Sequence, residues 1–411
     1  MASIVDAEAQ LFKKKVKDEQ EPFGLFMEGK KNTLVIPFEL VSNLIVVKVK
    51  IDHVDSLNFI LDTGVSNIII TEPSLKDSIN AQIYRKVEIS GGGEDTVVAG
   101  ISIGHKFSLN SITAFQQNLV ILETDILQLS SYLGMPIHGI FGSDLFEHFA
   151  VQINYKSRYL ELRKFEEFKP KAKYGQRVNL TINNNKPFIN DFEITDKTGS
   201  KSNITMVLDT GAGHALLFDD SKEEITRPDK TIMVGLGRGL NGEIMGDLGR
   251  LKAAKLGHTR FQDVLASYPV SSAYGEKFPP NEIERHGSIG GEFLRRFILT
   301  FNYKEGYVLV KPIKMYLKKP FEHDMSGLDI RAAGDKLEKM VVKYIVNDSP
   351  AAEAGLMIDD ELIFINDQKV DELSIAEVSQ LLSQRENKTI NMIVKRKGAL
   401  LLCTFKLKRV I

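Results

Sequence analysis

From residue 34 onward, short runs of aliphatic and β-branched residues alternate with turns rich in glycine, asparagine and aspartate. Runs of this kind predict β-strands, and their frequency predicts a chain built mainly of sheet. Typical runs are 44–51, 57–61 and 150–155. Residues 1–33 are polar and charged instead, so we expect a loose arm or a short helix there.

Two of the apolar runs end in the same four residues. Stretches 61–64 and 208–211 both read Leu-Asp-Thr-Gly, so each delivers one aspartate from a strand into a tight turn. A lone carboxylate is costly to bury, which makes this an unusual position for an aspartate. Two such groups that met could share one proton and so avoid two buried charges. The pattern indicates that Asp62 and Asp209 belong to one site.

The match extends beyond these two stretches. Asp62 and Asp209 lie 147 positions apart, and three further landmarks recur in the same order at similar spacing. They are the Gly-His turns at 104–105 and 257–258, the segments 142–146 and 290–294, and the segments 153–156 and 301–304. A repeat on this scale indicates a duplicated structural unit. We therefore expect two β lobes, related by a pseudo-twofold axis, that contribute one aspartate each.

The same features divide the chain. We expect lobe 1 over residues 34–162, a charged linker over 163–176, lobe 2 over 177–314 and a separate module over 322–411. A length of 411 residues agrees with two or three domains. Within lobe 1, a short helix is expected from residue 143, with Ser143 or Asp144 as its cap.

Composition excludes several classes of protein. Lys plus Arg (53) nearly balance Asp plus Glu (54), so no net charge favours nucleic acid or an anionic membrane as a partner. The single cysteine, Cys403, rules out an intrachain disulfide and a cysteine metal cluster. No apolar run is long enough to span a membrane, and the N-terminus does not read as a signal peptide. The compartment stays open, and an exported location with the signal removed is preferred to the cytoplasm.

On these residues the chain resembles the aspartic peptidases. Each lobe is similar to a retropepsin, with an Asp-Thr-Gly turn, a glycine flap and an apolar segment ending in glycine before a short helix; the apolar segments are 140–142 and 288–290. The resemblance covers residues 34–312 and implies an all-β, two-lobed acid-protease barrel. Because both lobes lie in one chain, as in pepsins, it also implies a site that is complete in a monomer. No metal or cofactor is implied.

The resemblance implies a role for each residue of the repeated turns. Asp62 and Asp209 would be a catalytic dyad that activates a water and shares one proton. Interlocked threonines and N–H-donating glycines would support them, namely Thr63, Thr210, Gly64 and Gly211.

Glycine-rich hairpins are expected to be flaps that close over the substrate. Their expected tips are Gly91, Gly92 and Gly93 in lobe 1 and Gly237, Arg238 and Gly239 in lobe 2. Residues 237–242 also fit G-x-G-x-x-G, the dinucleotide-binding pattern. That pattern needs a helix directly after it, and Gly246 and Gly249 follow here instead. We favour the flap, since lobe 1 has the matching hairpin.

The residues that follow the two glycines depart from the pepsin pattern. Val65 and Ala212 stand where pepsin-like enzymes usually carry Ser or Thr, and neither can donate a hydrogen bond to the ionised carboxylate. The pKa values of the dyad should therefore be higher, and the pH optimum nearer neutrality than that of pepsin. His214 is expected to line the site or to form a hydrogen bond, whereas His105 and His258 are expected to be structural. No spacing of His, Asp and Glu suggests a zinc site.

Residues 322–411 are similar to a PDZ domain, a small α+β fold. The resemblance rests on the Ser-Pro-Ala-x-x-Ala-Gly-Leu segment at 349–356 and on the strand that follows at 360–366; an amphipathic helix is expected at 374–382. PDZ domains bind a peptide C-terminus as an added strand beside the groove helix.

The expected peptide-binding residues are Gly327, Leu328, Asp329 and Ile330 in the carboxylate loop and Ile375 on the groove helix. Asp329 stands where the family has its second loop glycine, which puts capture of a terminal carboxylate in question. Ile375 favours apolar residues in the ligand. The alternative is a module that only packs on the protease lobes.

The sequence thus predicts an aspartic endopeptidase whose PDZ domain recruits or orients peptide or protein substrates. One alternative is a protease-shaped peptide-binding protein without useful turnover, against which the presence of both aspartates argues. The other is a scaffold in which PDZ binding is the whole function.

Overall fold

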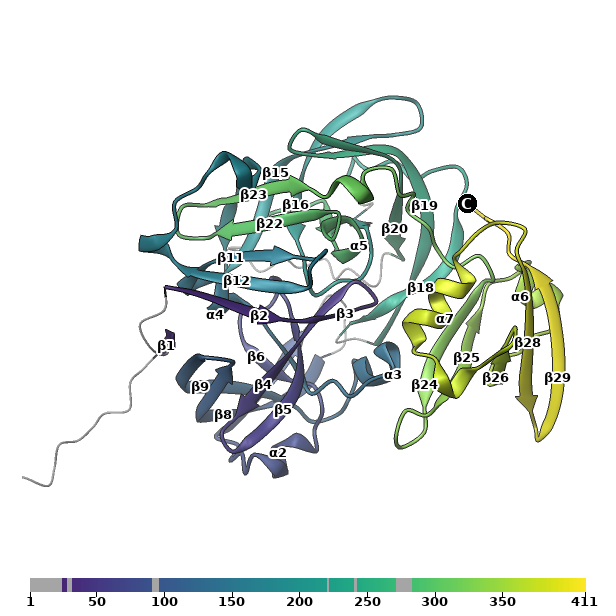
Figure 1. Ribbon diagram of the computed structural model, residues 1–411, viewed down its shortest axis with the longest axis horizontal. Coiled ribbons are helices and arrows are strands. Elements are labelled where there is room, and N and C mark those ends of the chain that lie inside the picture. Colours follow the sequence, from purple (N-terminus) through teal and green to yellow (C-terminus); the bar gives the residue numbers. More distant parts are fainter. Residues whose placement is uncertain (1–23, 28–31, 91–95, 220–221, 240–241, 271–282) are drawn as a thin grey trace, which may run out of the picture.

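The computed structural model of the chain describes residues 24–27, 32–90, 96–219, 222–239, 242–270 and 283–411. Over these residues the strands form four sheets: one in each lobe, one shared between the lobes, and one in the C-terminal module (Figure 1). The predicted class, two β lobes followed by a small α+β module, is confirmed. None of the described helices is long and apolar enough to cross a membrane.

The lobe 1 sheet runs in the order β1-β9-β6-β10-β5-β4-β8-β7, with β3 paired to β4. Its strands are β1 (Gly24–Met27), β3 (Glu39–Val41), β4 (Leu44–Ile51), β5 (Val54–Leu61), β6 (Ile68–Ile70), β7 (Arg85–Ser90), β8 (Thr96–Leu109), β9 (Ile112–Leu122) and β10 (Gly139–Phe141). Its helices are α2 (Leu75–Ser78), α3 (Leu129–Leu133) and α4 (Ser143–His148). The expected strands at 44–51 and 57–61 are confirmed as β4 and β5.

The lobe 2 sheet repeats this plan in the order β14-β15-β16-β21-β17-β20-β19-β18. Its strands are β14 (Thr181–Asn183), β15 (Lys186–Thr195), β16 (Lys201–Leu208), β17 (Leu216–Phe218), β18 (Ile232–Gly239), β19 (Gly242–Leu256), β20 (Thr259–Pro269) and β21 (Gly287–Ile289), and its helix is α5 (Gly291–Leu294). In each lobe a short strand pairs parallel to the strand that carries the aspartate: β10 with β5, and β21 with β16.

The third sheet joins the lobes and contains the symmetry axis. Its order is β13 (Gln176–Asn179), β23 (Tyr307–Pro312), β22 (Phe297–Asn302), β11 (Phe149–Asn154), β12 (Tyr159–Lys164) and β2 (Thr33–Pro37). At its centre Gln152 pairs with Thr300, and the Gln152 amide nitrogen donates to Thr300 Oγ1 at 3.1 Å. These two residues are repeat counterparts, and a residue meets its own counterpart only at a twofold axis. Every residue of β11 is buried, as expected for a strand covered on both faces.

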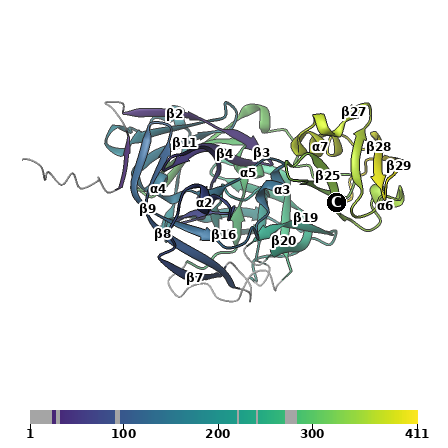
Figure 2. The same ribbon diagram turned by 90° about the horizontal axis from the view of Figure 1, so that it is seen from below.

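The C-terminal module lies to one side of the lobes, next to α3 (Figures 1 and 2). Its sheet runs β24-β25-β26-β28-β29, with β27 paired to β26. Its elements are β24 (Leu328–Ala333), β25 (Lys339–Ile345), α6 (Pro350–Glu353), β26 (Glu361–Ile365), β27 (Gln368–Lys369), α7 (Ile375–Leu382), β28 (Thr389–Arg396) and β29 (Ala399–Lys406). Ser374 caps α7 through a reciprocal bond with Glu377, as the serine at that position suggests. A separate hydrophobic core fills the module.

Two local expectations are wrong. Residues 24–27, expected in a loose or helical arm, form β1 at the edge of the lobe 1 sheet, where Phe26 packs on Phe115 with ring centroids 6.3 Å apart. Neither Ser143 nor Asp144 caps α4. The cap position is Gly142, which has no side chain, and Ser143 Oγ is buried without a partner among the described residues.

Arg296 anchors the segment that leads from lobe 2 into the module. Its side chain is 2% exposed, and its guanidinium donates to the carbonyls of residues 316, 319 and 320. It also bonds Glu292 and lies 3.4 Å from the ring centroid of Phe321. One buried cation therefore bonds three carbonyls of the connecting segment.

Replacing Arg296 tests this anchor. Arg296→Met should lower the free energy of unfolding by about 3–5 kcal/mol, because the buried carboxylate of Glu292 keeps only Arg295 as a cationic partner and the three carbonyls lose their bonds to the guanidinium. Denaturant unfolding measures the loss, and limited proteolysis at 314–321 measures release of the segment. Arg295→Met is the matched control, since Arg295 also pairs with Glu292 but is 30% exposed. Equal losses in the two variants would contradict the anchor.

Candidate active site

The two aspartates occupy equivalent positions directly after β5 and β16. The Asp62 N–H donates to the carbonyl of Phe141 at 2.8 Å, and the Asp209 N–H donates to that of Ile289 at 2.9 Å. Each aspartate is therefore held by the short parallel strand beside it, β10 or β21. Gly142 follows β10, and a Cβ on it would lie 1.6 Å from the carbonyl oxygen of Asp62. Only glycine allows this close approach.

The threonines that follow the aspartates bind across the axis. Thr63 Oγ1 donates to the carbonyl of Leu208 at 2.6 Å and accepts from the Thr210 N–H at 3.0 Å. Thr210 Oγ1 in turn donates to the carbonyl of Leu61 at 2.8 Å and accepts from the Thr63 N–H at 3.1 Å. Both side chains are fully buried. These four bonds hold the two turns together without solvent competition.

The glycines of the two turns donate hydrogen bonds to the carboxylates and leave space for them. The Gly64 N–H donates to Asp62 Oδ1 at 2.6 Å, and the Gly211 N–H donates to Asp209 Oδ1 at 2.9 Å. A Cβ on Gly211 would lie 2.1 Å from Asp62 Cγ. Gly211 is thus required for the Asp62 carboxyl to reach across to lobe 2.

The electrostatics of the pair favour a shared proton. The pKa of Asp62 is held well above its usual range, first by burial and then by the charge of Asp209, and a hydrogen bond between the two side chains adds to the rise. The Gly64 N–H lowers the pKa of Asp62, and so does the charge of Lys186. Val65 and Ala212 add no side-chain donor at the dyad. Two adjacent carboxyl groups in this setting can act as one acid and one base.

Three more titratable groups lie near the pair, two of them buried tyrosines and one a half-buried histidine. His214 Nε2 is 2.9 Å from Ser288 Oγ, and burial lowers the pKa of this histidine to about 4, so it is neutral near pH 7. Burial raises the pKa of Tyr155 and of Tyr303, with smaller contributions from the charges of Asp209 and Asp62 respectively. Neither tyrosine hydroxyl has a hydrogen-bond partner among the described residues. His214 therefore has the hydrogen-bonding position expected of it, not that of a base.

Comparison with protein families agrees with this geometry. A family described as aspartyl protease matches residues 47–145 and 193–293, one segment in each lobe, and a family described as PDZ domain matches residues 341–396. The chain combines an aspartyl protease domain with a C-terminal PDZ domain. No curated protein matches the chain. The two protease segments contain Asp62 and Asp209 at equivalent places, which agrees with the duplication.

The glycine-rich segment of lobe 2 forms a β-hairpin, as expected. β18 and β19 pair up to Gly239 and Gly242, so no helix follows the G-x-G-x-x-G pattern and the dinucleotide interpretation fails. Gly237 has a φ of +132°, which favours glycine. Arg238 Nε donates to the carbonyl of Ile126 in lobe 1 at 3.0 Å. In lobe 1, β7 and β8 form the matching hairpin, and its expected tip, Gly91 to Gly93, lies outside the described residues.

The PDZ residues singled out from the sequence lie at and just before β24 and at the start of α7, two elements that contact each other. Gly327, with a φ of +84°, approaches Ser349 so closely that a Cβ would lie 2.2 Å from that of Ser349. Leu328 is buried and Ile330 is half-buried on β24. Asp329 forms an ion pair with Arg331 at 2.8 Å instead of lining a carboxylate site. Ile375 is buried, with its side chain against Gly134 of lobe 1.

Sequence reasoning missed a second pair of repeat counterparts, His138 and His286. His138 Nδ1 accepts from the Asn58 N–H at 3.0 Å, and His286 Nδ1 accepts from the Thr205 N–H at 3.2 Å. Each histidine thus joins the strand before an aspartate to the segment before β10 or β21. Their spacing of 148 positions, the repeat offset, was the signal that could have found them.

A Ser-His-Asp arrangement in lobe 1 is structural. His105 lies between Asp52 Oδ2 and Ser102 Oγ, at 2.7 Å from each. Ser102 is 1% exposed, and its hydroxyl donates to the carbonyl of Gln82 at 2.8 Å. A nucleophile needs a free, reachable hydroxyl, so these residues brace the turn after β4. His258 donates its backbone N–H to the Gln176 side chain.

The threonine network gives a sharp test of the site. Thr63→Ala should lower the free energy of unfolding by about 2–4 kcal/mol, because the Thr210 N–H and the Leu208 carbonyl are left buried without partners. Thr63→Ser keeps the hydroxyl and should retain most of the stability. Denaturant unfolding of the two variants measures the difference. Equal losses would mean that the missing methyl group, not the hydrogen bonds, carries the effect.

Proposed function

We propose that the protease domain hydrolyses peptide bonds with a water held between Asp62 and Asp209. The ionised carboxyl takes a proton from the water as the water oxygen bonds to the carbonyl carbon, while the protonated carboxyl donates to the carbonyl oxygen. The carbon–nitrogen bond then breaks as the amine receives a proton. The reaction needs no covalent intermediate and no metal ion, because the shared proton supplies both an acid and a base.

One observation supports this proposal most strongly: the two carboxyl groups lie side by side, since a Cβ on Gly64 would be 2.9 Å from Asp62 Oδ1 and 3.6 Å from Asp209 Oδ1, while each carboxyl also accepts from the N–H of its own turn. Burial favours a neutral Asp62, so the pair is prepared to carry a single proton before substrate arrives. The crossed threonines hold this arrangement ready, which reduces reorganisation during the reaction.

The hairpins and the PDZ domain have accessory roles in this proposal. The β18–β19 hairpin, with Gly237 and Arg238 near its tip, covers the substrate together with the hairpin of lobe 1. The PDZ domain recruits or orients a peptide or protein for cleavage. The alternatives are a protease-shaped peptide-binding protein without useful turnover and a PDZ scaffold.

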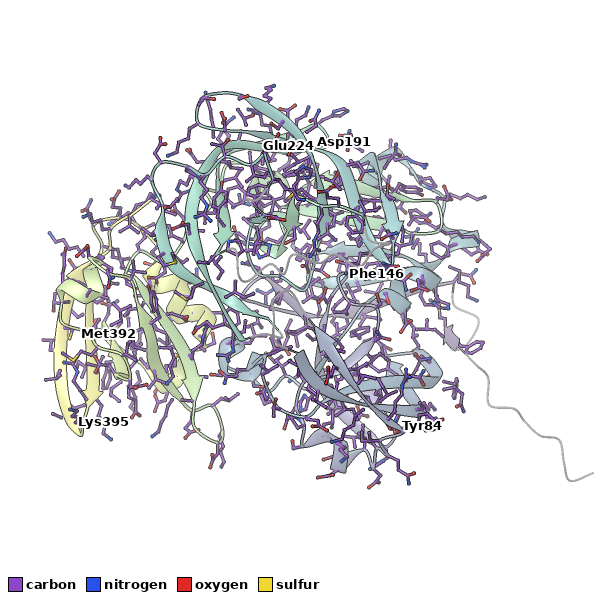
Figure 3. The ribbon with its side chains drawn as sticks, turned by 180° about the vertical axis from the view of Figure 1, so that it is seen from behind. Tyr84, Phe146, Asp191, Glu224, Met392 and Lys395 are labelled. Atoms are coloured by element: carbon purple, nitrogen blue, oxygen red, sulfur yellow. The ribbon has the colours of Figure 1, made fainter. Side chains whose placement is uncertain are left out.

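Cleavage of a mixed peptide library tests the proposal. The full chain should cut a defined set of bonds, a pepstatin-type inhibitor should block cleavage, and Asp62→Asn or Asp209→Asn should each lower kcat/KM by about 10²–10⁴-fold. Asp191→Asn is the matched control, since Asp191 is an exposed aspartate of lobe 2 (Figure 3).

Cleavage that survives in both dyad variants would contradict the mechanism. Tight binding of library peptides by the unmodified chain, with no cleavage, would favour the peptide-binding alternative.

A further inference from the structure

PDZ domains bind peptides between an edge strand and a helix, here β24 and α7, and we call this place the PDZ groove. Both elements contact a segment of lobe 1. The edge strand β24 contacts α3 (Figure 1). Ser131 Oγ donates to the carbonyl of Ala332 at 2.5 Å, and the Arg331 guanidinium lies 4.3 Å from the ring centroid of Tyr132. An incoming peptide strand would bond to this same edge, so the bond to Ala332 takes a position that a ligand would use.

The same segment of lobe 1 also contacts α7, the helix on the other side of the groove. Ile375, the first residue of α7, lies so close to Gly134 that a Cβ there would be 3.1 Å from Ile375 Cγ1 and Cδ1. Gly134 ends α3 with a φ of +68°. Residues 129–134 thus contact both walls of the groove, β24 and α7.

The carboxylate loop already holds a carboxylate. Asp324 Oδ1 accepts from the N–H groups of residues 326, 327 and 328, at 2.9, 2.6 and 3.2 Å, and from Ser326 Oγ at 2.6 Å. Successive N–H groups of this kind form an anion-binding concavity, and here a side chain of the same chain fills it. Asp329, the next acid along the chain, is already paired with Arg331. A free peptide C-terminus would therefore meet a site that the carboxylate of Asp324 already occupies.

We propose that residues 129–134 of lobe 1 are the resident ligand of the PDZ groove, which accepts an internal segment rather than a peptide C-terminus. The proposal refines the role of the PDZ domain within the proposed function. The docked domain also reaches the lobe 2 hairpin, since a Cβ on Gly235 would lie 3.4 Å from Asp329 Oδ2. Arg238 of that hairpin bonds to Ile126, just before α3. Docking therefore joins the groove, α3 and the β18–β19 hairpin.

Hydrogen exchange of the full chain tests the proposal. The variants are made in an Asp62→Asn background, which excludes self-cleavage. Ser131→Ala, Tyr132→Ala and Arg331→Ala should each speed deuterium uptake in β24, because each removes a contact between lobe 1 and the groove. For Tyr132→Ala and Arg331→Ala the increase should be about fivefold or more. Uptake in β18 should rise with it. Tyr84→Ala and Arg385→Ala are matched controls: both residues are exposed, and Tyr84 lies at the end of lobe 1 remote from the PDZ domain (Figure 3).

Unchanged uptake in β24 in both Ser131→Ala and Arg331→Ala, relative to the controls, would overturn the proposal. Ser131→Ala removes a single hydroxyl and is expected to fold, so the test does not depend on the larger substitutions. The measurement needs no hydrolysis. Its failure is therefore separate from a failure of the unmodified chain to cleave peptides.

Discussion

The crossed hydrogen bonds of Thr63 and Thr210 are the constraint on which the site depends. Each hydroxyl donates to a carbonyl of the other lobe and accepts an N–H from it, in an interior that excludes water. A buried network of this kind tolerates little displacement, because any shift leaves polar groups unpaired. The Asp-Thr-Gly turns therefore meet in one geometry, and the aspartates one residue before the threonines must come together.

That constraint also explains why a carboxyl group with an unfavourable charged form is present at Asp62. Burial and the neighbouring Asp209 both disfavour a second negative charge, which keeps the pKa of Asp62 high. A lone buried carboxyl group would destabilise the fold, whereas a pair held by rigid turns can share one proton and so provide both an acid and a base. Gly211 makes the arrangement possible, since any side chain there would occupy the space of the Asp62 carboxyl.

The repeat in the sequence was sufficient to predict the lobes, the strands before each aspartate and the pairing of the turns. It could not predict the cap of α4, because the cap position must be glycine to clear the Asp62 carbonyl, a contact between residues 80 positions apart in the chain. It also missed β1, since its four residues show too little pattern to separate a strand from an arm. The peptide-binding role of the PDZ residues stays a prediction, and the contact of Ile375 with Gly134 of lobe 1 depends on domain placement, which no local pattern encodes.

The PDZ domain is integrated with the protease at two places. Arg296 holds the connecting segment on lobe 2 through hydrogen bonds, and α3 of lobe 1 packs against the groove. Both contacts are made by buried or half-buried side chains, so the PDZ domain packs against the lobes in a defined orientation and is not joined to them by the linker alone. A peptide that bound the groove would have to replace contacts made by lobe 1, and binding would then be coupled to the β18–β19 hairpin.

The central claim is that Asp62 and Asp209 act as one pair carrying one proton, and the pH dependence of kcat/KM tests it most directly. At low pH the pair gains a second proton and loses its base; as pH rises through the raised pKa of Asp62, the pair loses its acid. The account predicts a bell-shaped profile whose maximum lies nearer neutrality than that of pepsin. A rate that stays constant or continues to rise through neutral and alkaline pH would contradict it, because no shared proton would then be required.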